Sequence, residues 1–337
     1  MRIFFCVLML IPVLGIAQDK IITTKVDEQE KTKVKVSNEI VTTRSDSAGI
    51  KRFTYWEKQN KVSFDFSQLS FVHWNAGGAN SVSALAAAHF NRNYMRDSYF
   101  WKNELIGRYG INNQEGRETR KTDDLIQLNS NFGYRTAENS DWFYSSKFTF
   151  TTQFTPGYAY PNTTKPISTF FAPAYLFLGV GAEYALKEKQ FTLYLSPLTQ
   201  KSTFVLDQAL ADAGAFGVDK AIYDAEGVRI RKGANSRTEI GFFINTQWKN
   251  EIFKNIILEN RLNLYSDYLN KFGNIDVDWM IKTDFVVNKY VRANILAHLI
   301  YDDDIKARKE FNGESTIIGP RIQLKQILGI GVVYEFK

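Results

Sequence analysis

Apolar and polar residues alternate with a period of two over long stretches of the chain from Lys61 onward. In the stretch 142–154 most of the aromatic residues fall on even positions, and Ser145, Lys147 and Thr149 fall on odd positions. Successive side chains of a β-strand point to opposite faces of a sheet, so this pattern predicts strands with one apolar and one polar face. Five further segments repeat it: 174–186, 238–248, 275–287, 291–301 and 322–336.

The charges and lengths of these six segments separate a membrane barrel from a soluble sandwich. None of the 41 positions on the apolar face is charged, whereas 12 of the 37 positions on the other face are. The segments exceed the ~5–6 residues of a usual globular strand and reach the ~9–11 that cross a bilayer at a tilt. Aromatic residues such as Trp101, Trp142 and Trp248 lie near segment ends, as the girdles of membrane barrels require. We therefore predict an all-β fold, a transmembrane antiparallel up-and-down β-barrel.

The pattern predicts about twelve strands. Ten is the alternative, because alanines blur the alternation in the second segment and the first is also weak. The predicted strands are 61–72, 81–93, 98–109, 121–135, 141–154, 171–186, 190–200, 236–248, 255–266, 274–287, 290–301 and 316–336.

The connections between these strands alternate between long and short. The long ones are 73–80, 110–120, 155–170, 201–235, 267–273 and 302–315. Outer-membrane barrels have short periplasmic turns and long extracellular loops, so the alternation predicts an outer-membrane location. An even strand count places both chain termini in the periplasm. The last strand carries Tyr334 and Phe336 on its apolar face, which resembles the C-terminal sorting signal of such barrels.

The N-terminal region predicts export. Residues 1–17 combine Arg2, an apolar run and small residues before Gln18, which is typical of a signal peptide. The run is shorter than the ~20 apolar residues of a spanning helix. Cys6, the one cysteine, lies inside this segment. Residues 18–54 are polar and lack aromatic residues between 19 and 52, so we expect a periplasmic tail, with a short added strand as the alternative. The barrel is expected over 55–337.

Composition narrows the choice of partners. The 337 residues are 44% hydrophobic and 15% aromatic, which excludes a disordered chain. A formal net charge of +6 is too small and too dispersed for nucleic-acid binding. The expected partners are outer-membrane lipid and lipopolysaccharide and the barrel assembly machinery, and an envelope protein partner is left open.

The sequence offers no constellation typical of an enzyme. His73, His89 and His298 are too scattered for a zinc site, and no GxSxG motif is present. The acidic run Asp302–Asp304 lacks EF-hand spacing, so a solvated loop is favoured over a calcium site. We therefore expect no catalytic residues, no metal and no cofactor.

The charges on the polar face have mixed sign, which favours ion pairing inside a narrow lumen over a wide pore. The predicted lumen charge network comprises Lys147, Glu183, Arg237, Glu239, Glu259, Arg261, Asp276, Asp278, Lys282, Asp284, Arg292, Arg321, Lys325 and Glu335.

The loop 201–235 departs from the β pattern. Val205, Leu206, Ala209 and Leu210 recur at helical spacing between Thr203 and Gly214, which predicts a short amphipathic helix. We expect this loop to form an extracellular lid. It either packs on the barrel rim for stability or constricts the mouth.

Several short motifs occur in a recognisable order. They are Trp74–Asn80, Arg120–Asp124, Ser196–Leu198, Ala215–Val218, Tyr301–Asp304, Gln323 and the ending Gly331–Phe336. Over roughly Tyr55 to Lys337 the chain resembles the domain-of-unknown-function family 3078. The resemblance implies a Gram-negative envelope protein of Bacteroidota, and it supplies no activity and no functional residue.

The function that these patterns favour is a non-enzymatic outer-membrane barrel acting as a narrow gated channel or an envelope scaffold. One alternative is a barrel whose extracellular loops bind a glycan or a partner protein. A secreted soluble β-protein is the third reading.

Overall fold

The computed structural model describes residues 42–45, 51–70, 79–135, 137, 140–186, 188–270, 272–303, 306–311 and 314–336. The predicted signal peptide, most of the predicted tail and His73 lie outside these ranges. Within the described residues, no helix combines the length and apolar character that crossing a membrane requires.

Twelve strands of the described residues form one closed antiparallel barrel. The strands are β3 (Trp56–Leu69), β4 (Ser81–Arg96), β5 (Tyr99–Gln114), β6 (Arg120–Tyr134), β7 (Trp142–Thr152), β10 (Ala174–Leu186), β11 (Phe191–Phe204), β14 (Ser236–Phe253), β15 (Ile256–Asp267), β16 (Asp276–Val286), β17 (Val291–Tyr301) and β20 (Gln323–Phe336). Each pairs with the next barrel strand along the chain, and β20 returns to pair with β3. The predicted fold class and the count of twelve are confirmed.

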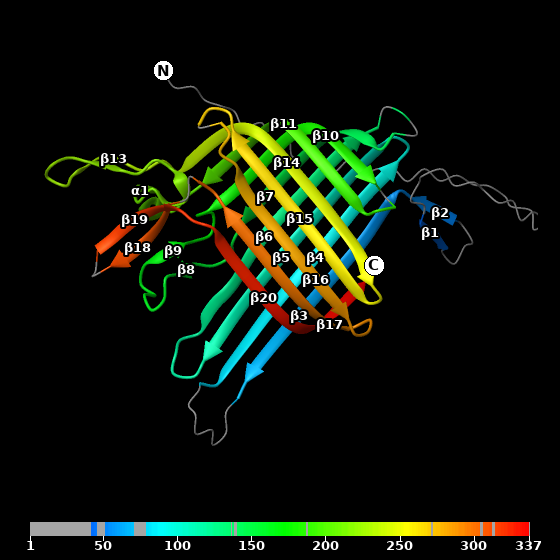
Figure 1. The fold of residues 1–337 in the computed structure, drawn as a ribbon, viewed down its shortest axis with the longest axis horizontal. Coiled ribbons are helices and arrows are strands. Elements are labelled where there is room, and N and C mark those ends of the chain that lie inside the picture. Colours follow the sequence, from blue (N-terminus) through cyan, green and yellow to red (C-terminus); the bar gives the residue numbers. More distant parts are fainter. Residues whose placement is uncertain are drawn as a thin grey trace, which may run out of the picture.

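The two ends of the barrel differ in their connections. Figure 1 shows α1 (Gln208–Asp212), β13 (Arg229–Arg231) and the pairs β8–β9 and β18–β19 on one side of the barrel. The C-terminus and the pair of β1 (Thr42–Ser45) with β2 (Lys51–Thr54) lie on the other side (Figure 1). We call these the long-loop end and the short-turn end. The β1–β2 pair means that the expected tail contains a small hairpin.

Several predicted segments differ in extent from the structure. The last predicted strand, 316–336, is two strands: β19 (Glu314–Pro320) pairs with β18 (Lys306–Phe311), and β20 begins at Gln323. Gly319 has a positive φ of 86°, and Pro320 has no N–H to continue a ladder, so the strand breaks there. Strands β5 and β6 also extend into the predicted long loop 110–120 and leave only 115–119 between them.

The predicted helix in the loop 201–235 is shorter than expected. Thr203 and Phe204 continue β11, since they pair with β10 and β14. The helix α1 begins after Asp207, whose side chain accepts hydrogen bonds from the N–H groups of Ala209 and Leu210. A 3-10 turn, η1 (Ala215–Gly217), and the pair of β12 (Ile222–Tyr223) with β13 complete the loop.

A bulge interrupts β11 at the motif Ser196–Leu198. The register between β11 and β14 shifts between Ser196 and Thr199. The Ser196 hydroxyl donates to the Val180 carbonyl at 2.9 Å, and the Thr199 hydroxyl donates to Ser196 at 2.7 Å. Both residues are fully buried, so these bonds satisfy polar groups on the inner side of the wall.

The junction where β20 meets β3, which we call the closing junction, is the shortest in the barrel. Six residue pairs join the strands, from Gly331 with Asp65 to Phe336 with Asn60. The neighbouring junction of β17 with β20 has ten. Within the described residues, Phe66–Leu69 on β3 and Gln323–Ile330 on β20 have no pairing partner across the closing junction. Strand pairing across it is therefore confined to its short-turn half.

Candidate functional site

The lumen is bridged by an ion pair between opposite walls. Arg261 on β15 and Glu104 on β5 lie six strands apart in the ring of twelve, yet Arg261 Nη2 is 3.7 Å from Glu104 Oε1. Glu104 is also held by His89 at 2.6 Å and by the Asn129 amide at 2.7 Å. Arg261 Nε donates to Glu259 at 2.6 Å. Two long side chains from opposite walls therefore meet inside the barrel at this level.

A second cluster of charged and polar side chains lies along one wall of the lumen. The Glu183 carboxylate on β10 is 1% exposed and lies 3.1 Å from the Lys147 ammonium on β7. Asn131 donates to Glu183 at 2.7 Å, and Lys147 donates across to Asn245 on β14 at 3.0 Å. Lys147 Nζ also lies 4.5 Å from the ring centroid of Tyr194, a fully buried side chain. These contacts pair the buried charges of Lys147 and Glu183, while the Oε1 atom of Glu183 accepts no hydrogen bond among the described residues.

At the long-loop end one lysine forms ion pairs with several carboxylates. Lys201 Nζ on β11 lies 2.6 Å from Asp276, 3.3 Å from Asp302 and 3.8 Å from Glu239. Ligand atoms of Asp276, Asp302 and Asp303 lie within 4.8 Å of one another. The Lys201 ammonium contacts two of these three carboxylates, so this cluster is an ion-pair network.

A further ion pair crosses the lumen between β20 and β6. Lys325 Nζ lies 2.8 Å from Asp123, four strands away around the ring. Arg108 Nε on β5 lies 3.3 Å from the other oxygen of Asp123. Contacts between distant strands thus occur at several levels of the lumen.

Most of the predicted lumen charges take part in ion pairs, many of them along one strand or between neighbouring strands. Described ion pairs include Lys147, Glu183, Arg237, Glu239, Glu259, Arg261, Asp276, Asp278, Lys282, Asp284, Arg292, Lys325 and Glu335. Asp278 pairs with His298 at 2.7 Å. Arg321 differs from the prediction: it is exposed in the segment between β19 and β20, because the break at Pro320 removes it from the barrel strand.

Sequence reasoning missed Lys102, Glu104, Arg108 and Lys201. Lys102, Glu104 and Arg108 fall on alternate positions of one predicted strand, so the period-two pattern could have placed them on the polar face. Lys201 lay just past the predicted end of its strand at 200. The structure extends this strand to Phe204.

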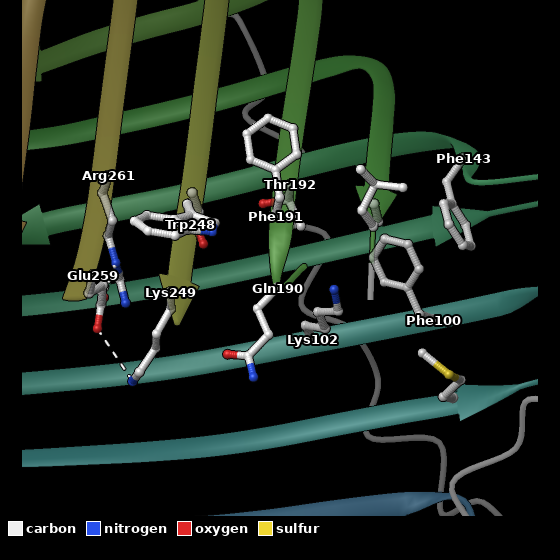
Figure 2. Close-up of a pocket in the computed structure, with 14 residues that line it drawn as sticks. Phe100, Lys102, Phe143, Gln190, Phe191, Thr192, Trp248, Lys249, Glu259 and Arg261 are labelled. Carbon is white, nitrogen blue, oxygen red and sulfur yellow. Dashed lines mark hydrogen bonds and ion pairs between the residues drawn. The ribbon is translucent and has the colours of Figure 1, made fainter. Parts of the chain in front are cut away.

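A cavity of about 270 Å³ opens at the short-turn end of the lumen. Figure 2 shows Phe100 and Phe143 on one side of it and Lys249, Glu259 and Arg261 on the other. The Phe100 and Phe143 rings meet edge-to-face at 5.0 Å between centroids. The Lys102 side chain lies between the two sides (Figure 2), with its ammonium 4.6 Å from the centroid of Phe100.

The four predicted lid residues are divided between the inside and the outside of their loop. Val205 is fully buried with Ala172, Ala211 and Val218, and Leu210 packs against this cluster. Leu206 and Ala209 are exposed. The Arg237 guanidinium donates to the Gly217 carbonyl at 3.3 Å, which ties η1 to the start of β14 at the barrel mouth.

The two residues of the predicted sorting signal lie side by side at the end of β20. The rings of Tyr334 and Phe336 stack at 5.7 Å between centroids, and both side chains are exposed. They therefore present an aromatic surface on the outside of the wall at the short-turn end.

Residues 66–158 match the model of a family described as "Protein of unknown function (DUF3078)". The family resemblance expected from the motifs is confirmed over this stretch. No similar sequence was found among curated proteins.

The solved structures that match this chain include two with low sequence identity. The translocator domain of the autotransporter NalP from Neisseria meningitidis is 11% identical, with 84% of this chain and 89% of that chain covered and a TM-score of 0.35. An outer membrane channel from Pseudomonas putida F1 is 10% identical, with 83% and 95% covered and a TM-score of 0.37.

Proposed function

We propose that the chain is a non-enzymatic outer-membrane β-barrel that acts as a narrow, gated channel. A closed barrel leaves no unpaired sheet edge over most of its circumference, as a hydrocarbon environment requires. Large apolar side chains such as Leu178, Ile240 and Leu328 are exposed on the barrel strands, where lipid and lipopolysaccharide would cover them. The short-turn end would face the periplasm and the long-loop end the exterior.

The observation that carries the channel proposal is the Glu104–Arg261 pair between opposite walls. An ion pair of opposite charges can separate without a change in the hydrogen-bonded wall, since the strands keep their backbone pairing. The pair is therefore suited to close a path and to release it. Glycan or partner binding by the loops has no comparable observation in its favour.

The channel proposal is tested by single-channel conductance in planar bilayers. Glu104→Gln removes one charge of the cross-lumen pair and should convert a closed baseline into resolvable openings. Glu335→Gln is the matched control, because Glu335 pairs with Arg292 on the neighbouring strand β17 and spans no lumen. If Glu104→Gln and a Glu104→Gln/Arg261→Gln double variant both remain closed, the gated-channel proposal fails and a scaffold role replaces it.

The membrane location is tested separately by gel migration. A detergent-extracted barrel should migrate differently before and after boiling, because the folded barrel resists unfolding by the detergent of the gel. Recovery of the folded protein from the soluble fraction without detergent would contradict the location.

A further inference from the structure

We propose that the cavity at the short-turn end binds a small organic anion with an apolar body, such as an aromatic carboxylate. The ligand class is inferred from the geometry of the cavity. The coupling of ligand binding to conduction rests on the proposed channel function. The cavity volume of about 270 Å³ lies just below the ~300 Å³ at which small-molecule sites begin, so a single-ring acid suits it.

The chemistry of the cavity is divided between two sides. Phe100 and Phe143 are almost fully buried and form the apolar side of the lining, where an apolar body would pack. On the opposite side Lys249 and Arg261 offer N–H donors to an anion (Figure 2). A ligand with an apolar end and an anionic end therefore matches both sides at once.

The charges of the lining favour an anion. The lining holds three cationic side chains, Lys102, Lys249 and Arg261, and one carboxylate, Glu259. Two carboxylates outside the lining also pair with these cations, Glu104 with Arg261 and Glu183 with Lys102. The best contact of Glu259 is with Arg261 at 2.6 Å, while Lys249 lies at 3.4 Å and its side chain is 53% exposed. Lys102 is 41% exposed and lies 3.8 Å from Glu183. Both ammonium groups are thus held loosely enough to turn toward a ligand.

Arg261 connects this cavity to the constriction. Its guanidinium lines the cavity and also forms the 3.7 Å pair with Glu104. An anion bound at Arg261 competes with Glu104 for the same guanidinium. By linkage, a change that frees Arg261 from Glu104 must strengthen anion binding, and the bound anion must weaken the cross-lumen pair.

The binding site is tested with the full barrel in phosphatidylcholine nanodiscs by calorimetric titration, with empty nanodiscs subtracted. The probe is 3-phenylpropionate and the neutral comparison is 3-phenylpropanol. The anion should bind about tenfold or more tightly than the alcohol, since charge-assisted hydrogen bonds are lost with the carboxylate. Lys102→Gln/Lys249→Gln should weaken binding of the anion by a similar factor. Lys61→Gln, a lysine on β3 outside the cavity lining, is the control and should leave binding unchanged.

Equal binding of acid and alcohol, or an unchanged affinity in the double variant, would overturn the site. The coupling between anion binding and the Glu104–Arg261 pair is also tested by titration. Glu104→Gln should raise the affinity for the probe several-fold, and Glu335→Gln should leave it unchanged. Equal affinities in the two variants would refute the coupling. These titrations require no conductance. If the probe binds as expected while no variant conducts, the site stands and the channel function fails.

Discussion

The ring of Phe100 lies directly over Gly133, its register partner on β6. A Cβ on residue 133 would overlap the ring atoms of Phe100, so glycine leaves the space that this inward aromatic side chain occupies. Phe100 in turn meets Phe143 and forms the apolar side of the cavity. One missing side chain in the wall thus allows an aromatic cluster inside the lumen.

We expect Gly133→Ala to lower the free energy of unfolding by about 1–3 kcal/mol, because the ring must leave its position or the strand must move. Denaturant titration of the barrel in detergent measures this change. Gly107→Ala is the matched control, because its added methyl group would meet only the Phe154 ring at an ordinary 3.9 Å. Equal losses in the two variants would show that Phe100 does not require this glycine.

Charge placed on the outer face should be costly. Phe148→Arg or Ile281→Arg sets a cation against lipid and should cost about 2–4 kcal/mol near the bilayer midplane. Thr149→Arg, one residue from Phe148 and therefore on the lumen side, should be tolerated better. The yield of heat-modifiable barrel in the membrane fraction measures both effects, and similar yields would mean that the assigned faces are wrong.

The anchoring of the loop 205–235 should depend on pH. A hydrogen bond from the Gly233 N–H, supported by Gln208 and Arg229, holds the pKa of Asp212 below its ordinary value of 3.8. A lowered pKa means that the ionised carboxylate stabilises the folded loop. This contribution is complete above pH 3.8 and is lost as the pH falls through the lowered pKa.

Hydrogen exchange of the amides in 205–235, corrected for intrinsic rates, measures this effect. Protection should fall in acid for the native chain, whereas Asp212→Asn should be less protected at neutral pH and insensitive to acid. Asp219→Asn serves as the control in the same loop. Identical acid profiles for the native chain and Asp212→Asn would contradict the role of Asp212.

Shortening the loop should leave the barrel intact. The Val205 N–H donates to the Asn235 carbonyl at 2.8 Å, so a short linker can join the two ends in place of 206–234. In the Glu104→Gln background this variant should conduct more than Glu104→Gln alone if the loop narrows the mouth. An unchanged conductance would leave the loop with a packing role only.

The faces of the strands could be predicted from the sequence because they depend on local alternation. Lys147 and Glu183 were assigned to the lumen in this way, and the structure pairs them across neighbouring strands. The contact of Glu104 with Arg261 could not be predicted. It joins strands on opposite sides of the ring, and the period-two pattern shows which face a residue lies on but not which distant strand it meets. Arg321 was predicted on a barrel strand and lies outside it, because the strand breaks locally at Pro320.

The closing junction also bears on how the barrel forms. The Asn60 side chain donates to the Phe336 carbonyl at 3.1 Å across 276 positions of the chain, the greatest separation that any barrel junction must bridge. Contacts so distant in sequence carry the largest entropic cost of loop closure and are made late. Only six residue pairs form between β20 and β3 to offset this cost, and they lie at the short-turn half of the junction. We therefore expect ring closure to be a late step of folding that is driven by few strand contacts.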